Sequence, residues 1–164
     1  MIFVTLGSQK FQFNRLLKKI DELIENGTIT QPVFAQIGAS DYVPKHYAFQ
    51  PFLDRETFSD YMSRCDTVIT HGGTGAIIGA VKKGKKVVAV PRRAKYGEHV
   101  DNHQLQIIDQ FYDLNLIYPC EDVEELGMAL ADVKERQFAA YVSSTEAVIQ
   151  SISAFIAQIG SSNP

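Results

Sequence analysis

Residues 67–81 carry the pattern that decides the fold, TVITHGGTGAIIGAV. The β-branched run Thr67–Thr70 predicts a buried strand, and the apolar run Ala76–Val81 predicts a helix. Between them, the segment His71–Gly75 contributes three glycines. A strand, a glycine-rich turn and a helix in direct succession are typical of one repeating unit of a parallel α/β sheet.

The chain on both sides of this unit repeats the alternation of strand and helix. Further strands are predicted at residues 2–6, 32–37, 47–49, 85–90 and 116–118. Further helices are predicted at residues 13–24, 55–64, 99–112 and 123–131. Because the strands are nearly continuous apolar runs, they suit a sheet that is buried on both faces. The sequence therefore predicts a single α/β domain over residues 1–160, with a parallel sheet covered by helices on both faces, and a flexible tail at residues 161–164.

A last helix is predicted from about Glu135 to Ile159. Its apolar side chains recur at helical spacing, at Ile149, Ile152, Phe155, Ile156 and Ile159. Such a stripe suits a helix that packs on its own domain. Docking of part of the stripe on a second polypeptide is the alternative, and the sequence leaves it open.

Composition excludes several classes of function. The 164 residues carry a formal net charge of −3, which argues against a nucleic-acid-binding protein, because such proteins normally show a basic stripe. The two cysteines, Cys65 and Cys120, lie far apart and in no metal-ligand spacing, so we expect neither a disulfide framework nor a metal site. The longest apolar runs fall short of the roughly 18 residues that a spanning helix requires. We therefore expect a soluble, cytoplasmic protein.

The glycine-rich loop predicts an anion site. Ligands of an open parallel sheet bind beyond the carboxyl ends of its strands, and this loop follows a strand and opens a helix. Its backbone N–H groups and the helix dipole attract a phosphate, and Gly72, Gly73 and Gly75 let the main chain approach it without a Cβ in the way. Thr74 and His71 can add side-chain hydrogen bonds. Glycines needed for packing alone are the alternative interpretation.

Two further elements of this anion site are expected at the same edge of the sheet. Gly7 and Ser8 follow the first strand. The sequence contains no Asp-x-Asp pair and no P-loop motif, so a departing diphosphate would be stabilised by backbone N–H groups, by hydroxyls and by Arg92 or Arg93. Each arginine also suits an ordinary surface position.

A second polar cluster, EHVDNHQ, spans residues 98–104. Side-chain amides both donate and accept hydrogen bonds, as sugar hydroxyls do, so Asn102, His103 and Gln104 are predicted to orient a sugar. The alternative is that Asp101 or Asn102 simply caps the following helix.

The same cluster supplies the local candidates for a general base, Glu98 and His99. A residue of a partner chain competes with both. The sequence does not separate a base from a binding residue here.

A run of lysines at residues 82–86 precedes a strand and therefore lies at the opposite edge of the sheet. We interpret it as the solvated end of a helix. Weak attraction to an anionic membrane surface is the alternative.

Four segments, taken together in this order, resemble one known family. They are residues 4–8 (VTLGS), 65–73 (CDTVITHGG), 88–91 (VAVP) and 101–104 (DNHQ). The combination resembles the carboxyl-terminal, donor-binding half of GT-B glycosyltransferases over about residues 1–130, and implies a Rossmann-like domain. Within that family the chain is similar to the donor-binding subunits of the eukaryotic dolichol-linked N-acetylglucosaminyltransferase and of two-component bacterial capsule and exopolysaccharide β-1,4-galactosyltransferases.

The resemblance implies an inverting, metal-independent transfer of a hexose, with UDP-galactose as the expected donor and a lipid-linked saccharide as the acceptor. No cofactor is implied beyond the UDP-sugar donor substrate. Complete enzymes of the family include an acceptor-binding amino-terminal half, so the resemblance implies a membrane-associated partner subunit that recruits this chain to the inner face of the membrane. Gly79 stands where many members carry a ribose-binding glutamate. Ribose recognition is therefore expected elsewhere.

Two other functions remain open from the sequence. The chain suits a non-catalytic helper that steadies a partner glycosyltransferase. It also suits a stand-alone nucleotide-sensing domain.

Overall fold

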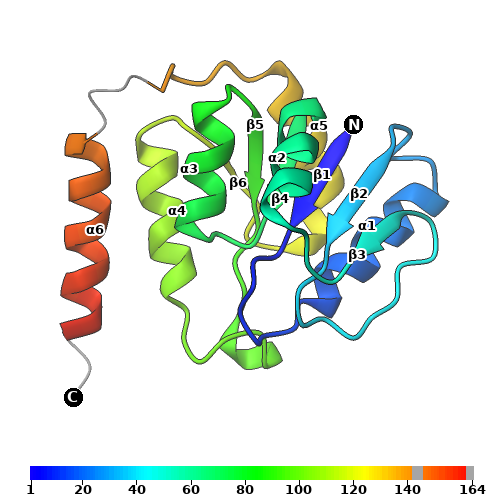
Figure 1. The fold of residues 1–164 in the computed structure, drawn as a ribbon, viewed down its shortest axis with the longest axis horizontal. Coiled ribbons are helices and arrows are strands. Elements are labelled where there is room, and N and C mark those ends of the chain that lie inside the picture. Colours follow the sequence, from blue (N-terminus) through cyan, green and yellow to red (C-terminus); the bar gives the residue numbers. More distant parts are fainter. Residues whose placement is uncertain (142–145, 162–164) are drawn as a thin grey trace.

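A computed structural model describes residues 1–141 and 146–161. The described residues form one six-stranded, fully parallel sheet with the strand order β3-β2-β1-β4-β5-β6 (Figure 1). This is the order of doubly wound dinucleotide-binding folds, in which the chain reverses direction across the sheet at one switch point. The strands are β1 (Ile2–Thr5), β2 (Val33–Gln36), β3 (Ala48–Gln50), β4 (Thr67–Thr70), β5 (Lys86–Ala89) and β6 (Tyr118–Pro119).

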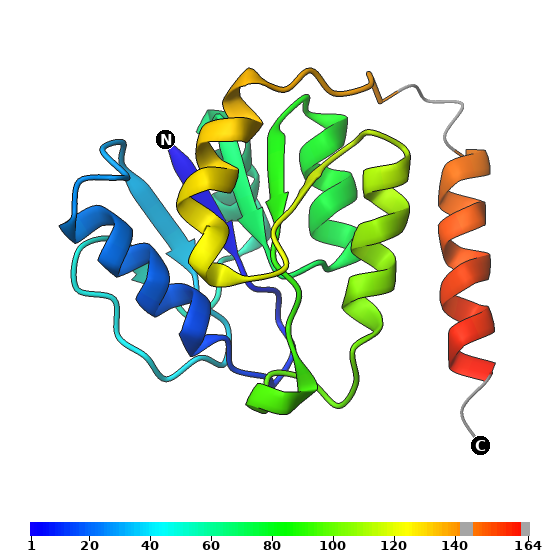
Figure 2. The same cartoon turned by 180° about the vertical axis from the view of Figure 1, so that it is seen from behind.

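Helices cover both faces of the sheet, as the sequence predicts. One face carries α1 (Asn14–Glu25) and α5 (Leu126–Glu135), which lie in front of the strands in Figure 2. The opposite face carries α2 (Arg55–Arg64), α3 (Thr74–Lys82) and α4 (His103–Asp113). The apolar side chains form two clusters, one on each side of the sheet, because every central strand buries both of its faces.

The register of the central strands brings their carboxyl ends to one level. Thr5 at the end of β1 lies beside Gln36 of β2 on one side and beside Thr70 of β4 on the other. Thr70 in turn lies beside Ala89 of β5. The loops that follow β1, β4 and β5 therefore meet at one edge, which is the lower side of the view in Figure 1. The switch point lies between β1 and β4, where ligands of such sheets bind.

The helix predicted at 99–112 begins four residues later, at His103. Residues 99–102 are not helical, and before them a short 3-10 helix, η1 (Ala94–Tyr96), ends at Gly97 in a left-handed conformation (φ +68°). The side chain of Asp101 accepts a hydrogen bond from the His103 amide at 3.0 Å and so forms a turn ahead of α4, whose N-cap Asn102 makes no side-chain cap hydrogen bond. The prediction was wrong here because local side-chain hydrogen bonds compete with the helical ones.

The helix predicted from about Glu135 to Ile159 is also corrected. Helix α5 follows the 3-10 turn η2 (Val123–Glu125) and ends at Glu135, and residues 136–141 are not helical. The Arg136 guanidinium there lies 5.0 Å from the centre of the Tyr112 ring and 5.7 Å from that of Phe138. These contacts favour an extended segment that crosses the amino edge of the sheet. Residues 142–145 and the expected tail at 162–164 lie outside the described residues, whereas residue 161 belongs to the final helix.

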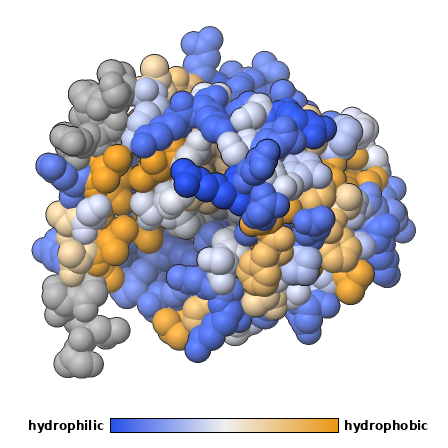
Figure 3. Space-filling view, in the orientation of Figure 1, coloured by the Kyte–Doolittle hydropathy of each residue, from blue (hydrophilic) through white to orange (hydrophobic). Residues whose placement is uncertain are grey.

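This final helix, α6 (Glu146–Ser161), packs against α4. Ile152 is buried in the cluster that contains Ile108 and Phe111 of α4, whereas Ile156 keeps 39% of its surface exposed. Figure 3 shows hydrophobic side chains gathered where α6 lies beside the helices of this face. The stripe of α6 therefore packs at least in part on its own domain, which was the first of the two interpretations.

The lysine run at residues 82–86 makes contacts that the sequence does not reveal. Lys85 Nζ donates at 2.7 Å to the carbonyl oxygens of both Ser63 and Cys65, at the end of α2. Lys86 Nζ donates to the carbonyls of Lys134 and Arg136, at the end of α5. Because the last carbonyls of a helix lack partners within the helix, these ammonium groups stabilise two helix ends.

Among the described helices, none combines the length and the apolar character that crossing a membrane requires.

Candidate functional site

His71 forms the floor of the carboxyl-edge site and is held between two glycines. A Cβ added to Gly7 would meet His71 Cε1 at 2.8 Å, and a Cβ added to Gly73 would meet the same ring at 2.6 Å. Gly72 has φ +86°, and a Cβ there would meet Ile108 at 2.9 Å. Three of the predicted glycines are thus required by packing around one imidazole and one helix. Packing, the alternative interpretation of these glycines, therefore explains at least part of their presence.

The buried position of His71 sets its charge. Burial, with a smaller contribution from the Arg92 charge, lowers the pKa of His71 to about 4, so the ring is neutral at pH 7. Its Nδ1 lies 3.4 Å from the carbonyl oxygen of Thr5, which can only accept a hydrogen bond. The proton of the neutral ring is therefore directed to β1, and the ring supports the loop from below.

The start of α3 presents free backbone donors beside His71. Gly73 precedes the helix in an extended conformation, and no side chain of the described residues caps it. The first N–H groups of a helix have no partner within the helix, so the amides at Thr74 and Gly75 are open to a ligand. Thr74 is half-buried and Gly75 is exposed. This arrangement suits a phosphate group.

Arg92 places a buried positive charge under the loop that follows β1. Its guanidinium is fully buried, and Nη2 donates to the carbonyl oxygens of Leu6 at 2.9 Å and Phe11 at 3.1 Å. Its Nε and Nη1 have no hydrogen-bond partner among the described residues. Burial lowers the pKa of Arg92 to about 10, which still leaves the group charged at pH 7. Gly7 and the exposed Ser8 lie in the loop above it.

The side-chain amides of the second cluster hold the loop that leads into α4. The Gln104 side-chain oxygen accepts from the Arg92 amide at 2.9 Å, and that of Asn102 accepts from the Ala94 amide at 3.1 Å. Each residue thus uses its carbonyl oxygen internally and keeps its NH2 group for a ligand. His103 is 38% exposed at the start of α4. Donors of the kind that recognise hydroxyls are therefore fixed in place by the loop.

Glu98 is committed to a buried ion pair. Its side chain is 1% exposed, and the Arg15 guanidinium binds both oxygens, with Nε to Oε1 at 2.9 Å and Nη2 to Oε2 at 3.0 Å. The Arg93 amide donates to Oε2 as well. Both carboxylate oxygens are thus engaged by donors of the chain itself, so this geometry corrects the expectation of Glu98 as a base and assigns it a positioning role.

His99 keeps the geometry of a candidate base. Its ring packs against Phe11 with 4.7 Å between the ring centres, and its Nδ1 lies 3.2 Å from Asp101 Oδ1. Asp101 contacts this nitrogen twice, since its backbone N–H also donates to His99 Nδ1 at 3.4 Å, and it thereby orients the imidazole. The His99 side chain is 17% exposed, which leaves part of it accessible.

The family model for the glycosyltransferase family 28 C-terminal domain matches residues 1–159. The chain belongs to this family. The membership agrees with the fold, with the carboxyl-edge position of the glycine-rich loop and with the family resemblance of the sequence.

Curated relatives of this family 28 domain include subunits of one enzyme from several eukaryotes. The chain is 28% identical over 131 residues to the human UDP-N-acetylglucosamine transferase subunit ALG13, covering 73% of this chain and 11% of that protein. It is 30% identical over 93 residues to the Yarrowia lipolytica protein of the same name, covering 56% of this chain and 45% of that protein. The chain therefore spans less than half the length of these relatives.

Solved structures with the same fold are glycosyltransferases of the GT-B type. The kitacinnamycin glycotransferase superposes with a TM-score of 0.61 at 16% identity, covering 82% of this chain and 35% of that one. Acinetobacter baumannii MurG superposes with a TM-score of 0.57 at 17% identity, covering 81% and 40%. In each, this family 28 domain matches well under half of the longer chain.

Sequence reasoning missed two residues that shape the family 28 site. Arg15 looks like any charged position of an amphipathic helix, and its partner Glu98 lies 83 residues away. Gly38 has φ +59°, and a Cβ there would meet the Gly7 carbonyl oxygen at 2.9 Å. A glycine directly after a predicted strand was the available signal for Gly38. No local signal pointed to Arg15.

Proposed function

We propose that this chain is the donor-binding, catalytic subunit of an inverting glycosyltransferase that uses a UDP-sugar. The observation that carries the proposal is the convergence of unpaired helix N–H groups, the buried Arg92 charge and the Asn102–Gln104 cluster at one switch point of the sheet. Each part suits a different portion of a sugar diphosphate. Together they match the ligand class that the family name implies.

The proposed mechanism is direct displacement at the anomeric carbon by an acceptor hydroxyl. Backbone donors at residues 72–75 hold the departing diphosphate, and the Arg92 charge beneath the β1 loop stabilises the negative charge that develops on it. The NH2 groups of Asn102 and Gln104, together with His103, orient the hexose. His99 or a residue of the partner accepts the proton of the attacking hydroxyl.

The proposed assembly needs a second polypeptide. The ALG13 relatives reported above are named as subunits of a transferase. This supports a partner that binds the acceptor, a lipid-linked saccharide, at the membrane. We propose a cytoplasmic location for this chain, at the inner face of the membrane beside that partner.

Two donors compete within this proposal. The resemblance of the sequence to the bacterial β-1,4-galactosyltransferase subunits favours UDP-galactose and a role in capsule or exopolysaccharide synthesis. The names of the curated relatives favour UDP-N-acetylglucosamine.

Sugar transfer by the reconstituted pair tests the proposal. The chain is purified with its partner, and transfer from UDP-galactose and from UDP-N-acetylglucosamine to a lipid-linked saccharide is measured with and without EDTA. We expect transfer from one donor, undiminished by EDTA, and a large loss of rate for Gln104→Ala. Full activity of both His71→Ala and Gln104→Ala would overturn the assignment. A non-catalytic helper would bind neither UDP nor a UDP-sugar in calorimetry.

A further inference from the structure

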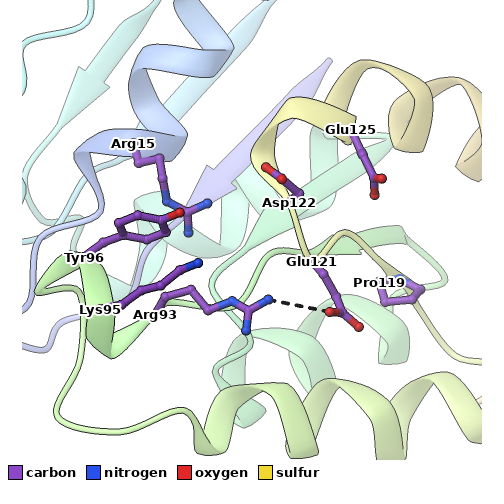
Figure 4. A pocket seen from close by; sticks show the side chains of 8 residues that line it. All are labelled: Arg15, Arg93, Lys95, Tyr96, Pro119, Glu121, Asp122 and Glu125. Carbon is purple, nitrogen blue, oxygen red and sulfur yellow. Dashed lines mark ion pairs between the residues drawn. The ribbon is translucent and has the colours of Figure 1, made fainter.

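A cavity of about 500 Å³ opens beside the donor site, on the side of the sheet that carries α1 and α5 (Figure 4). Its walls come from three parts of the chain: Arg15 of α1, residues 93–96 after β5, and residues 119–125 after β6. The donor-binding mechanism uses none of these side chains. The volume lies in the range of small-molecule sites, about 300–1,000 Å³.

Two consecutive residues, Arg92 and Arg93, connect the donor site with this cavity. Arg93 is extended (φ −119°, ψ 129°), and successive side chains of an extended segment point in opposite directions. Arg92 accordingly turns under the β1 loop, whereas Arg93 turns into the cavity, where it is 24% exposed. A ligand in the cavity would therefore lie next to the donor without occupying its site.

The charges of the cavity narrow the class of ligand. Figure 4 shows the cationic tips of Arg15, Arg93 and Lys95 facing a wall that carries carboxylates. The carboxylates belong to Glu121, Asp122 and Glu125. Positive and negative side chains balance in this described lining, so a simple anion would meet the carboxylates and a simple cation would meet the guanidinium and ammonium groups. A neutral ligand avoids repulsion from charges of either sign. If it carries many groups that both donate and accept hydrogen bonds, it can also pair with the polar groups of both walls.

Tyr96 adds an aromatic surface to this polar cavity. Half of Tyr96 is exposed, and two cations pack over its ring and fix its orientation, the Arg15 guanidinium at 4.6 Å and the Lys95 ammonium at 4.8 Å. Arg15 is itself fixed by the ion pair with Glu98. The ring is thus an ordered, partly apolar surface at the mouth of the cavity. Sugar rings combine an apolar C–H face with a rim of hydroxyls, and this lining complements both.

We propose that the cavity binds a neutral mono- or disaccharide. Donors at Arg93 and Lys95 and acceptors at Glu121 and Asp122 bind vicinal hydroxyls, which replace the 3.6 Å ion pair between Arg93 Nη2 and Glu121 Oε2. Tyr96 contacts the sugar through the half of its surface that is exposed. If the proposed function holds, this saccharide is the part of the acceptor next to the attacking hydroxyl. The donor-binding chain then contributes to acceptor recognition, which its partner would otherwise supply alone.

The experiment is an amide NMR titration of the full chain with lactose, cellobiose and maltose, and separately with UDP. We expect at least one disaccharide to shift amides at residues 93–96 and 119–125, and UDP to shift those at 72–75. Tyr96→Ala and Glu121→Gln should each weaken the saccharide about tenfold, which corresponds to about 1.4 kcal/mol. Phe52→Ala removes another aromatic ring that is 54% exposed and should change nothing.

Two outcomes would overturn the saccharide site. They are the absence of shifts with all three sugars, and shifts at residues 93–96 and 119–125 that Tyr96→Ala and Glu121→Gln leave unchanged. The UDP arm is independent of these. UDP shifts without saccharide shifts leave the proposed function standing and remove this inference. Saccharide shifts without UDP shifts support the saccharide site and count against the proposed function.

Discussion

The imidazole of His71 lies between two glycines, so single atoms decide the shape of the donor loop. A methyl group on Gly73 would approach the ring to 2.6 Å, a distance that Cβ atoms essentially never adopt. Because the ring is buried and directed to Thr5, it has little room to move. Glycine at this position is thus required by contact with His71, in addition to the access that it gives a phosphate.

Replacing Gly73 by alanine should destabilise the fold and weaken donor binding together. We expect a loss of about 1–3 kcal/mol in the free energy of unfolding, as for overpacking of a buried site. The matched control is Gly79→Ala on the same helix, where the new methyl group meets no described atom within 4 Å. This control should stabilise the protein by about 0.5–1 kcal/mol, since alanine favours a helix. Urea denaturation measures both, and equal behaviour of the two variants would contradict the packing argument.

The lowered pKa of His71 predicts a pH dependence of stability. The folded chain holds the ring neutral down to about pH 4, whereas the unfolded chain binds a proton near the ordinary value of 6.5. The contribution of His71 to the free energy of unfolding should therefore be fully present above pH 6.5. Up to about 3 kcal/mol of it should be lost as the pH drops to 4.

Chemical denaturation between pH 4 and 7.5 measures how the free energy of unfolding changes with pH, and His71→Gln should flatten this dependence. An undiminished dependence in His71→Gln would show that another group causes it.

Asp21 titrates outside this range. Desolvation raises its pKa, but hydrogen bonds from Tyr42, Lys45 and His46 outweigh that effect and lower the pKa from 3.8. The contribution of Asp21 to stability is therefore lost only at more acidic pH.

Because of the Arg15–Glu98 ion pair, we expect Glu98→Gln to lower the stability of the fold and not to remove a catalytic base. Removing one charge of a buried pair leaves the other without compensation, and because Arg15 is 21% exposed we expect a cost of about 2–4 kcal/mol. Asp60→Asn breaks the exposed pair with Arg64 and should cost less than about 0.5 kcal/mol. Thermal unfolding compares them. A fully stable Glu98→Gln with a shifted pH–rate profile would restore Glu98 as a base.

At the scale of elements, the strands were predictable and the ends of the helices were less so. The four central strands follow from their apolar runs, whereas β6 covers only Tyr118–Pro119 and extends past the predicted strand at 116–118. The start of α4 depends on a left-handed Gly97 and on the turn in which Asp101 accepts from the His103 amide, and both outweigh its apolar periodicity.

Long-range contacts set the remaining limits of prediction. The segment at 136–141 is not helical because it contacts distant residues: Arg136 packs on Tyr112, and the Ala139 amide donates to the Asn115 carbonyl oxygen. In the candidate site, too, local motifs were predictable from the sequence and long-range pairs were not. The glycine-rich loop is visible in the sequence, but the Arg15–Glu98 pair joins residues far apart in the chain.

The lysine contacts at the amino edge predict an element-scale effect. Lys85→Met removes the donor to the last carbonyls of α2 and should lower the free energy of unfolding by about 1–2 kcal/mol. Lys10→Met, at an exposed lysine in the loop after β1, is the control and should have little effect. Urea denaturation checks both variants. Normal stability of Lys85→Met, with weaker binding to anionic vesicles, would instead support the membrane interpretation.

At the scale of the whole molecule, the sheet divides its functions between two edges. The carboxyl edge collects the loops after β1, β4 and β5, which carry the proposed donor site and the adjacent cavity. The amino edge is closed by lysine contacts and by the extended segment before α6. A family 28 domain built in this way presents one functional face, and we propose that the partner subunit docks there.

Calorimetric titration of the purified chain with UDP, and with uridine as the matched ligand that lacks the diphosphate, tests the central claim most directly. The donor site as described anchors its ligand through the diphosphate, at the start of α3 and above Arg92. We predict that UDP binds at one site and that uridine binds at least about tenfold more weakly, a difference of about 1.4 kcal/mol. Equal affinities, or no heat of binding with UDP, would contradict the account.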